Sequence, residues 1–164
     1  MTRTAPPPEA AREFVKVDRT LTYRLHLLHK LSDQVSQRLY PLEVGLSLSD
    51  ARCLAAVGSF EPLSVNRLAQ LANLNKAQAS RAAQSLAEQG LVIKADHPAD
   101  GRGVELTLTP AGRKVWRKAM DFIERRNAAI FGCLGERDQQ TLSKLLDRLL
   151  AHANAGANDT APDA

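Results

Sequence analysis

The chain has few of the residues and motifs on which most enzymes and secreted proteins depend. Its 164 residues include two cysteines, Cys53 and Cys133, which form no CxxC pair. The sequence therefore predicts neither a disulfide framework nor a cysteine-ligated metal site. No HExxH, GxxxxGKS/T or GxSxG motif occurs, and no set of nucleophile, base and oxyanion donors can be assembled. We expect no enzymatic activity, no cofactor and no metal.

Aromatic residues and long apolar runs are scarce as well. Aromatic residues make up 4% of the chain, which argues against a surface that stacks single-stranded bases, because such surfaces need several exposed rings. No apolar run approaches the roughly 18 residues of a transmembrane helix, and residues 1–10 lack the apolar core of a signal peptide. We expect a cytoplasmic protein with no membrane partner.

The charge is mildly basic. The chain has 22 Lys and Arg against 18 Asp and Glu, a formal net charge of +4, with a pI near 9.3. This balance suits an anionic partner but does not choose between a nucleic acid and a membrane surface. Hydrophobic residues make up 44% of the chain, which is enough to build a core.

A long helix and a second helix are predicted at the start of the chain, after a disordered tail at residues 1–10. Apolar residues recur at steps of three, four or seven over residues 11–41, which is one stripe of a helix. These residues are Phe14, Val17, Leu21, Leu25, Leu28, Val35 and Leu39. Pro41 is expected to end this helix, because proline disfavours helix in the residue before it. Ser47, with Asp50 three residues on, predicts the capped start of a helix that runs to Gly58.

A helix-turn-helix is predicted next. Ser64 can cap a short helix with Val65 and Leu68 facing inward, and Asn73–Asn75 forms a tight turn. Asn75 then caps a second helix, which ends at Gly90. The inward face of that helix consists of Ala79, Ala82, Ala83 and Leu86.

The period of the pattern then changes from helix to strand. Leu91–Ile93 is prone to form a strand, and the residues of Val104–Leu108 alternate between apolar and polar. The loop between them is rich in turn formers, so we expect a β-hairpin beside the helix-turn-helix, which is a winged helix over residues 46–108. Thr109 and Pro110 predict the start of a long helix that Gly135 breaks. We assign residues 109–152 to two C-terminal helices and residues 153–164 to a disordered tail. The predicted fold class is mainly α with a small β-hairpin wing.

The polar side of the second helix is suited to reading duplex DNA. In a helix-turn-helix this helix enters the major groove, where Arg pairs with guanine and Gln with adenine. Arg102, between two glycines at the hairpin tip, fits a narrow minor groove. Asp100 is better interpreted as holding this loop through a local hydrogen bond or a salt bridge to Arg81 or Arg102 than as contacting a base. The alternative is an ordinary amphipathic helix with a solvated face. The candidate DNA-binding residues are Ser64, Lys76, Ala77, Gln78, Ser80, Arg81, Gln84 and Arg102.

Residues 49–112 resemble the winged helix-turn-helix core of the MarR (multiple antibiotic resistance regulator) family. The motifs that carry the resemblance are LAQL at Leu68–Leu71, SRxxxxLxxxGLV from Ser80 to Val92, DGRG at Asp100–Gly103 and LTLTPAG at Leu106–Gly112. The flanking helices match the family's dimerisation elements in position and length. Family members are dimeric regulators, usually repressors, that bind palindromic operators and often release them on binding small phenolic or aromatic acids.

The resemblance implies roles for particular residues, and the sequence also departs from the family pattern. Ser80 and Arg81 would contact DNA from the recognition helix, and Arg102 from the wing tip. The family often has an acidic residue and an Arg where this chain has Gln84 and Ser85, and often a basic residue at Ala99. These departures affect which operator is bound rather than how it is bound.

The terminal helices carry more apolar surface than one protomer can cover. Leu27 and Leu31 widen the first stripe, and a leucine row runs from Leu142 to Leu150. A two-fold dimer would bury these faces and present two reading heads. A monomer whose terminal helices cap a single core is the alternative. We expect a homodimer that binds double-stranded DNA.

The resemblance also implies an effector pocket where the first, second and fifth helices meet the winged domain. A small aromatic carboxylic acid would need an Arg or His partner and apolar walls. The candidate residues are Arg19, Tyr23, His26, His29, Tyr40, Arg52 and Cys53. Each has a structural alternative, such as a solvated arginine or a surface histidine.

Two rival sensing mechanisms remain open. The first is a thiol redox sensor that uses Cys53 or Cys133, although Cys53 lies among apolar residues and a reactive thiol needs exposure. The second is a zinc ion shared by His26 and His29, for which the sequence shows only two neighbouring ligands.

Overall fold

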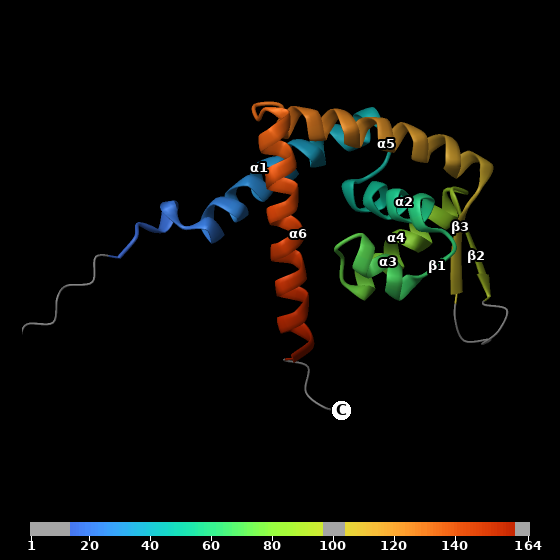
Figure 1. Ribbon diagram of the computed structural model, residues 1–164. Helices are drawn as coiled ribbons and strands as arrows, with labels where there is room; N and C mark the ends of the chain where they lie inside the picture. The colour runs from blue at the N-terminus through green and yellow to red at the C-terminus, as the bar shows by residue number, and fades with distance from the viewer. Residues whose placement is uncertain (1–13, 97–103, 160–164) are drawn as a thin grey trace, which may run out of the picture.

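The polypeptide folds into six α-helices and a small sheet within residues 14–96 and 104–159, the part of the chain that the computed structural model describes (Figure 1). In chain order the elements are a 3-10 helix η1 (Val17–Arg19), α1 (Leu21–Glu43), α2 (Leu48–Phe60), β1 (Leu63–Ser64), α3 (Val65–Leu71), α4 (Lys76–Glu88), β2 (Val92–Asp96), β3 (Val104–Leu108), α5 (Pro110–Phe131) and α6 (Glu136–Asp159). This arrangement confirms the predicted fold class, a mainly α protein with a β-hairpin wing.

The winged helix-turn-helix consists of α2, α3, α4 and the sheet. The antiparallel strands lie in the order β1-β3-β2, with Leu63 opposite Leu106 and Val92 opposite Leu108. Alternation along β3 turns Leu106 and Leu108 inward. Their side chains join a core whose largest fully buried members are Leu54, Leu68, Leu86, Leu106, Val57 and Cys53. Most of the core therefore lies inside the winged domain, and Tyr40 of α1 with Ala119 and Phe122 of α5 extends it between the long helices.

The predicted helix starts are confirmed by their caps. The Ser47, Ser64 and Thr109 side chains accept hydrogen bonds from the backbone amides three residues on, at 3.1, 3.2 and 2.8 Å. These bonds satisfy amides that the first turn of a helix leaves without a partner. The Asp50 carboxylate accepts a hydrogen bond from Ser85 of α4 at 3.2 Å. That bond ties α2 to the recognition helix.

The prediction for the first helix was wrong at both ends. The helix does not include Phe14–Arg19: Thr20 is its N-cap and accepts a hydrogen bond from the Tyr23 amide. Pro41 does not end it, since α1 continues to Glu43 with the proline inside. Tertiary packing overrides the local preference, because Tyr40, the residue before the proline, is buried with its ring 4.8 Å from that of Phe122 in an edge-to-face contact.

The C-terminal helices also differ from the prediction in their bounds. Helix α5 ends at Phe131, with Gly132 as its C-cap, before Gly135 is reached. The tail predicted from residue 153 is helical to Asp159. Alanine alternates with other residues over this stretch, and alanine has the highest helix propensity, so a helix nucleated by the leucine row extends through it.

Strand β1 was not predicted from the sequence. It is two residues long, follows Pro62 and pairs with β3. So short a segment has no periodicity, and only its partner strand defines it.

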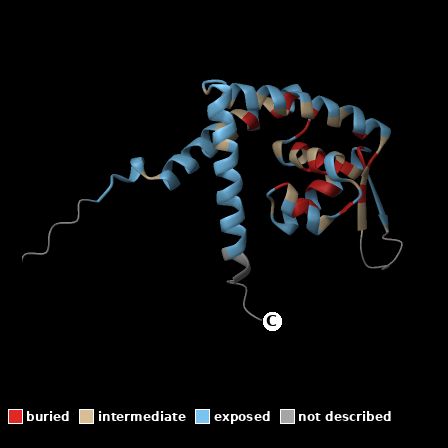
Figure 2. Cartoon of the chain, viewed as in Figure 1, coloured by how far each residue is buried: buried red, intermediate tan, exposed pale blue. Residues whose placement is uncertain are grey.

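The terminal helices extend away from the winged domain. Helix α5 lies along one side of that domain, whereas the first half of α1 and the whole of α6 project from it (Figure 1). No residue of α6 up to position 155 is buried, and Leu21–Leu31 is exposed throughout (Figure 2). Across the described ranges no helix combines the length and apolar character needed to span a membrane.

Candidate nucleic-acid interface

Helix α4 presents a polar face to solvent because its opposite face is buried. Ala79, Ala82, Ala83 and Leu86 are buried as predicted. The side chains predicted to contact DNA are all exposed on this helix; they are Lys76, Ala77, Gln78, Ser80, Arg81 and Gln84. The helix can approach a groove closely, because alanine and serine occupy part of this face.

The start of α4 is held rigidly by a reciprocal capping box. Asn75 Oδ1 accepts a hydrogen bond from the Gln78 amide at 2.8 Å, and Gln78 Oε1 accepts one from the Asn75 amide at 3.1 Å. The Gln78 side chain therefore has a structural role, and its Nε2 group remains available as a donor. A shallow groove of about 300 Å³ runs beside this end of the helix. Its lining residues are Ser49, Asp50, Gln78, Arg81, Ala82 and Ser85.

Gln84 connects the recognition helix to the wing. Its Oε1 accepts a hydrogen bond from Lys94 Nζ of β2 at 2.9 Å, and its Nε2 donates one to Glu88 at 2.8 Å. The two charged partners fix the orientation of the amide, since the reverse orientation would place like groups together. Sequence reasoning missed Lys94, whose only signal was its position directly after the predicted strand segment Leu91–Ile93.

The remaining predicted DNA contacts lie at the edges of this face. Ser64 is exposed at the start of α3, where its Oγ caps the helix and its hydroxyl hydrogen is left to donate. Arg102 and Asp100 of the hairpin tip lie outside the described residues. The role of each of these side chains in DNA binding stays a prediction.

Of the residues predicted to bind an effector, only His29 and Arg52 line a common cavity. This cavity has a volume of about 590 Å³ between α1, α2, α3 and α5. Its other walls are Ala55, Ala56, Ser59, Phe60, Leu71, Ala72, Asn73, Met120 and Ile123. The cavity joins two basic side chains to largely apolar walls, which is the composition expected of a small-molecule site.

Asp33 pairs with both basic side chains of this cavity. Its carboxylate lies 2.7 Å from the Arg52 guanidinium and 3.5 Å from Nε2 of His29, one helical turn away. No local pattern predicts the Asp33–Arg52 pair, because it joins two helices that are separated along the chain. An anion entering the cavity would compete with Asp33 for Arg52.

The other predicted effector residues are dispersed. Arg19 lies in η1, and Tyr23 and His26 are exposed on α1. Tyr40 is buried in the core against Phe122, and this burial raises the pKa of its hydroxyl, although Arg52 and Arg126 act in the opposite direction. No three metal-ligating side chains come together within the described ranges, so no third ligand joins His26 and His29 there.

Cys53 is fully buried. Desolvation, with a further contribution from Asp50, raises the pKa of its thiol to about 12. A thiol held protonated in this way is a poor nucleophile, which argues against redox sensing at Cys53. Cys133 is exposed in the turn between α5 and α6.

A helix-turn-helix with an exposed recognition face and an adjoining hairpin defines a winged-helix DNA-binding protein, and comparison with known proteins agrees. Residues 44–103 match the model of the MarR family. The chain is 27% identical over 129 residues to the HTH-type transcriptional repressor Rv2887 of Mycobacterium tuberculosis, covering 79% of this chain and 90% of the relative.

Solved structures show the same fold. A MarR/EmrR family regulator from Acinetobacter sp. ADP1 superposes with a TM-score of 0.78 at 23% identity, covering 86% of this chain and 99% of that one. Bordetella bronchiseptica BpsR, whose DNA binding is regulated by 6-hydroxynicotinic acid, gives 0.75 at 20% identity, covering 84% and 97%. Residues 44–103 thus match the MarR family model, and the described fold is the one that MarR family regulators adopt.

Proposed function

We propose that this regulator is a homodimeric repressor that binds a palindromic operator and is released from it by a small aromatic carboxylic acid. The observation that carries the proposal is the pairing of an exposed reading face on α4 with uncovered leucine faces on α1 and α6. The α4 face can bind one half-site of an operator. The leucine faces of α1 and α6 provide the surface through which two subunits can associate.

The leucine faces support the dimer. Leu21 is 81% exposed, and Leu149 and Leu150 are each 61% exposed. Burying one such side chain contributes about 1.5–3 kcal/mol, so two copies of α1 and α6 gain substantially by packing together. Residues of both helices line one surface groove of about 540 Å³, so α1 and α6 contribute to the same apolar surface. The lining residues are Leu21, Leu145, Arg148, Leu149 and His152.

Two-fold symmetry accounts for the palindromic operator. A dimer with a two-fold axis repeats the same α4 face on both sides of that axis, so its half-sites are inverted copies about one helical turn apart. The repressor named among the relatives supports repression as the outcome.

The cavity beside Arg52 supports an aromatic acid as the effector. Its apolar walls suit a ring, and Arg52 provides a guanidinium that can bind a carboxylate at two points. BpsR, which shares this fold, responds to an aromatic acid of this class. The cavity is lined by α1, α2, α3 and α5, so a ligand there contacts both the winged domain and the long helices α1 and α5.

Trp116 provides a direct probe of this site. It is the single tryptophan of the chain, and its Nε1 donates a hydrogen bond of 3.3 Å to the Ala55 carbonyl of the cavity wall. Titration with hydroxybenzoates and nicotinate-like acids should change its fluorescence and weaken operator binding.

Arg52→Gln should reduce the affinity for the active acid at least tenfold, as expected for a lost charged hydrogen bond.

Arg125→Gln is the matched control, because Arg125 also pairs with a carboxylate, that of Glu43 at 3.0 Å, but does not line the cavity. This variant should bind the acid normally. An operator affinity that no acid in the panel changes would contradict the effector part of the proposal, and equal losses in the two variants would contradict the site.

A further inference from the structure

At the base of the wing, the Glu61 side chain accepts a hydrogen bond from a β3 amide that β1 is too short to pair with. Pro62 and the two-residue β1 leave the end of β3 without a partner on that side, beyond the pair Leu63–Leu106. The Leu108 amide lies on the same side of β3 as that of Leu106, because amides two residues apart point the same way. It donates instead to Glu61 Oε2, at 2.6 Å.

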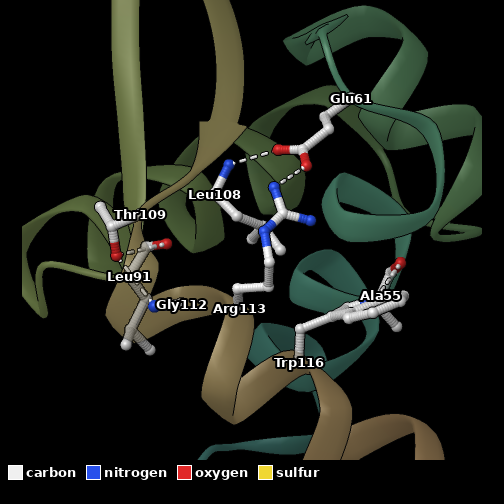
Figure 3. A network of polar contacts seen from close by, with 8 residues as sticks. All are labelled: Ala55, Glu61, Leu91, Leu108, Thr109, Gly112, Arg113 and Trp116. Atoms are coloured by element: carbon white, nitrogen blue, oxygen red, sulfur yellow. Dashed lines mark hydrogen bonds and ion pairs between the residues drawn. The ribbon is translucent and has the colours of Figure 1, made fainter.

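The other carboxylate oxygen of Glu61 is held from α5. Arg113 Nη2 donates to Glu61 Oε1, so one side chain joins the end of α2, the end of β3 and the first turn of α5 (Figure 3). The Glu61 side chain is only 18% exposed. Although this partial burial raises its pKa, the Leu108 amide and Arg113 outweigh that effect, and the net pKa is lowered.

The other strand of the wing is fixed at its base by a second set of bonds. The Thr109 amide donates to the Leu91 carbonyl at 3.0 Å, and Thr109 Oγ1 donates to the Gly90 carbonyl at 2.7 Å. Thr109 thus ties the start of β2 to α5, while Glu61 ties the end of β3 to α2 and α5. Together with the Lys94–Gln84 bond to α4, these two attachments hold the direction in which the strands of the wing leave the domain.

We propose that Glu61 is a positioning residue for DNA binding, which sets the angle of the wing relative to α4 and so its contact with the duplex. Each wing strand has five residues, which gives a lever of about 17 Å at ~3.4 Å per residue. A rotation of a few degrees at Leu108 therefore displaces the far ends of the two strands, at Asp96 and Val104, by about 1–2 Å, enough to break a hydrogen bond.

The test compares Glu61 variants on an operator recovered by selection from random duplexes. Glu61→Ala leaves the Leu108 amide without its acceptor and should weaken operator binding about five- to tenfold. Hydroxyl-radical footprints should lose protection at the flanks, where a wing contacts the minor groove, and keep it under α4. Glu61→Gln keeps an acceptor for Leu108 and should stay within about threefold of the unaltered protein.

Glu43→Ala is the matched control, since it removes a carboxylate paired with an arginine of α5 away from the wing. It should change neither affinity nor footprint. If Glu61→Ala unfolds, Arg113→Met, which releases only one side of the carboxylate, should give the same flank-specific loss on a smaller scale.

A double-mutant cycle with Arg102→Ala decides whether Glu61 acts through the wing, and it rests on the proposed contact of Arg102. In the Arg102→Ala background, Glu61→Ala should lower the operator affinity less than twofold, because the Arg102 contact with DNA is already absent. The proposal is overturned if the two losses multiply, if Glu61→Ala weakens all parts of the footprint equally, or if it weakens binding while Arg102→Ala does not. Failure of any acid to release the operator would leave this result unaffected.

Discussion

At the scale of single residues, the environment decides what each functional group can do. Cys53 and Cys133 have the same chemistry, but one is enclosed among the side chains of the core and the other is exposed in a turn. His29 and Arg52 share one carboxylate beside a cavity, whereas His26, three residues from His29, faces solvent. Residue type alone could not separate these cases, because burial is set by elements distant in the sequence.

Cys53 should be inert in the folded protein. Because its thiol pKa is raised to about 12, the thiolate that reacts with disulfide reagents is almost absent at pH 8. Titration with a chromogenic disulfide should therefore label one cysteine quickly, and the second only after unfolding in denaturant. Cys133→Ser should show no fast phase, and a fast phase in that variant would contradict the buried position of Cys53.

At the scale of elements, the junction between the sheet and α5 depends on close backbone approach. A Cβ at Gly112 would collide with the carbonyl of Leu91. This carbonyl accepts the Thr109 hydrogen bonds and belongs to the same network as Arg113 (Figure 3). The glycine in the first turn of α5 is therefore a packing requirement.

Gly112→Ala should destabilise the protein even though alanine favours helix. The clash is with backbone, which cannot move aside cheaply, so we expect a loss of about 2–4 kcal/mol in the free energy of unfolding, measured by denaturant titration. Gly135→Ala is the control, since nothing lies within 4 Å of the position of its Cβ. Equal effects of the two substitutions would show that the close approach is not as described.

Local sequence patterns predicted the elements well where a cap or a period defines them. The α2, α3, α4 and α5 starts followed from Ser47, Ser64, Asn75 and Thr109, because a capping side chain acts within three residues. The prediction that Pro41 ends the first helix was wrong, because the packing of Tyr40 outweighs the local effect of proline. Strand β1 and the Asp33–Arg52 and Glu61–Arg113 pairs could not be predicted, because each joins segments brought together only by folding.

At the scale of the whole molecule, the uncovered leucine faces predict a dimer that is required for operator binding. Leu149→Asp places a charge on a side chain that is 61% exposed in the single chain, so the fold should survive while the dimer dissociates. Sedimentation should show monomers, and operator affinity should fall at least tenfold, because a single head contacts only one half-site.

Leu149→Met keeps an apolar side chain of similar volume and should remain dimeric. A Leu149→Asp protein that stays dimeric and binds the operator with unchanged affinity would contradict the role of α6 in joining the subunits.

Selection of random duplex DNA by the 164-residue chain tests directly whether a symmetric dimer reads DNA with α4. A symmetric dimer should enrich an inverted repeat whose half-sites are about one helical turn apart, with binding that weakens steeply with salt. Arg81→Ala should relax the preferred base at one position in each half-site. Enrichment of single, non-palindromic sites, or the same base preferences in Arg81→Ala, would contradict a symmetric dimer that reads DNA with α4.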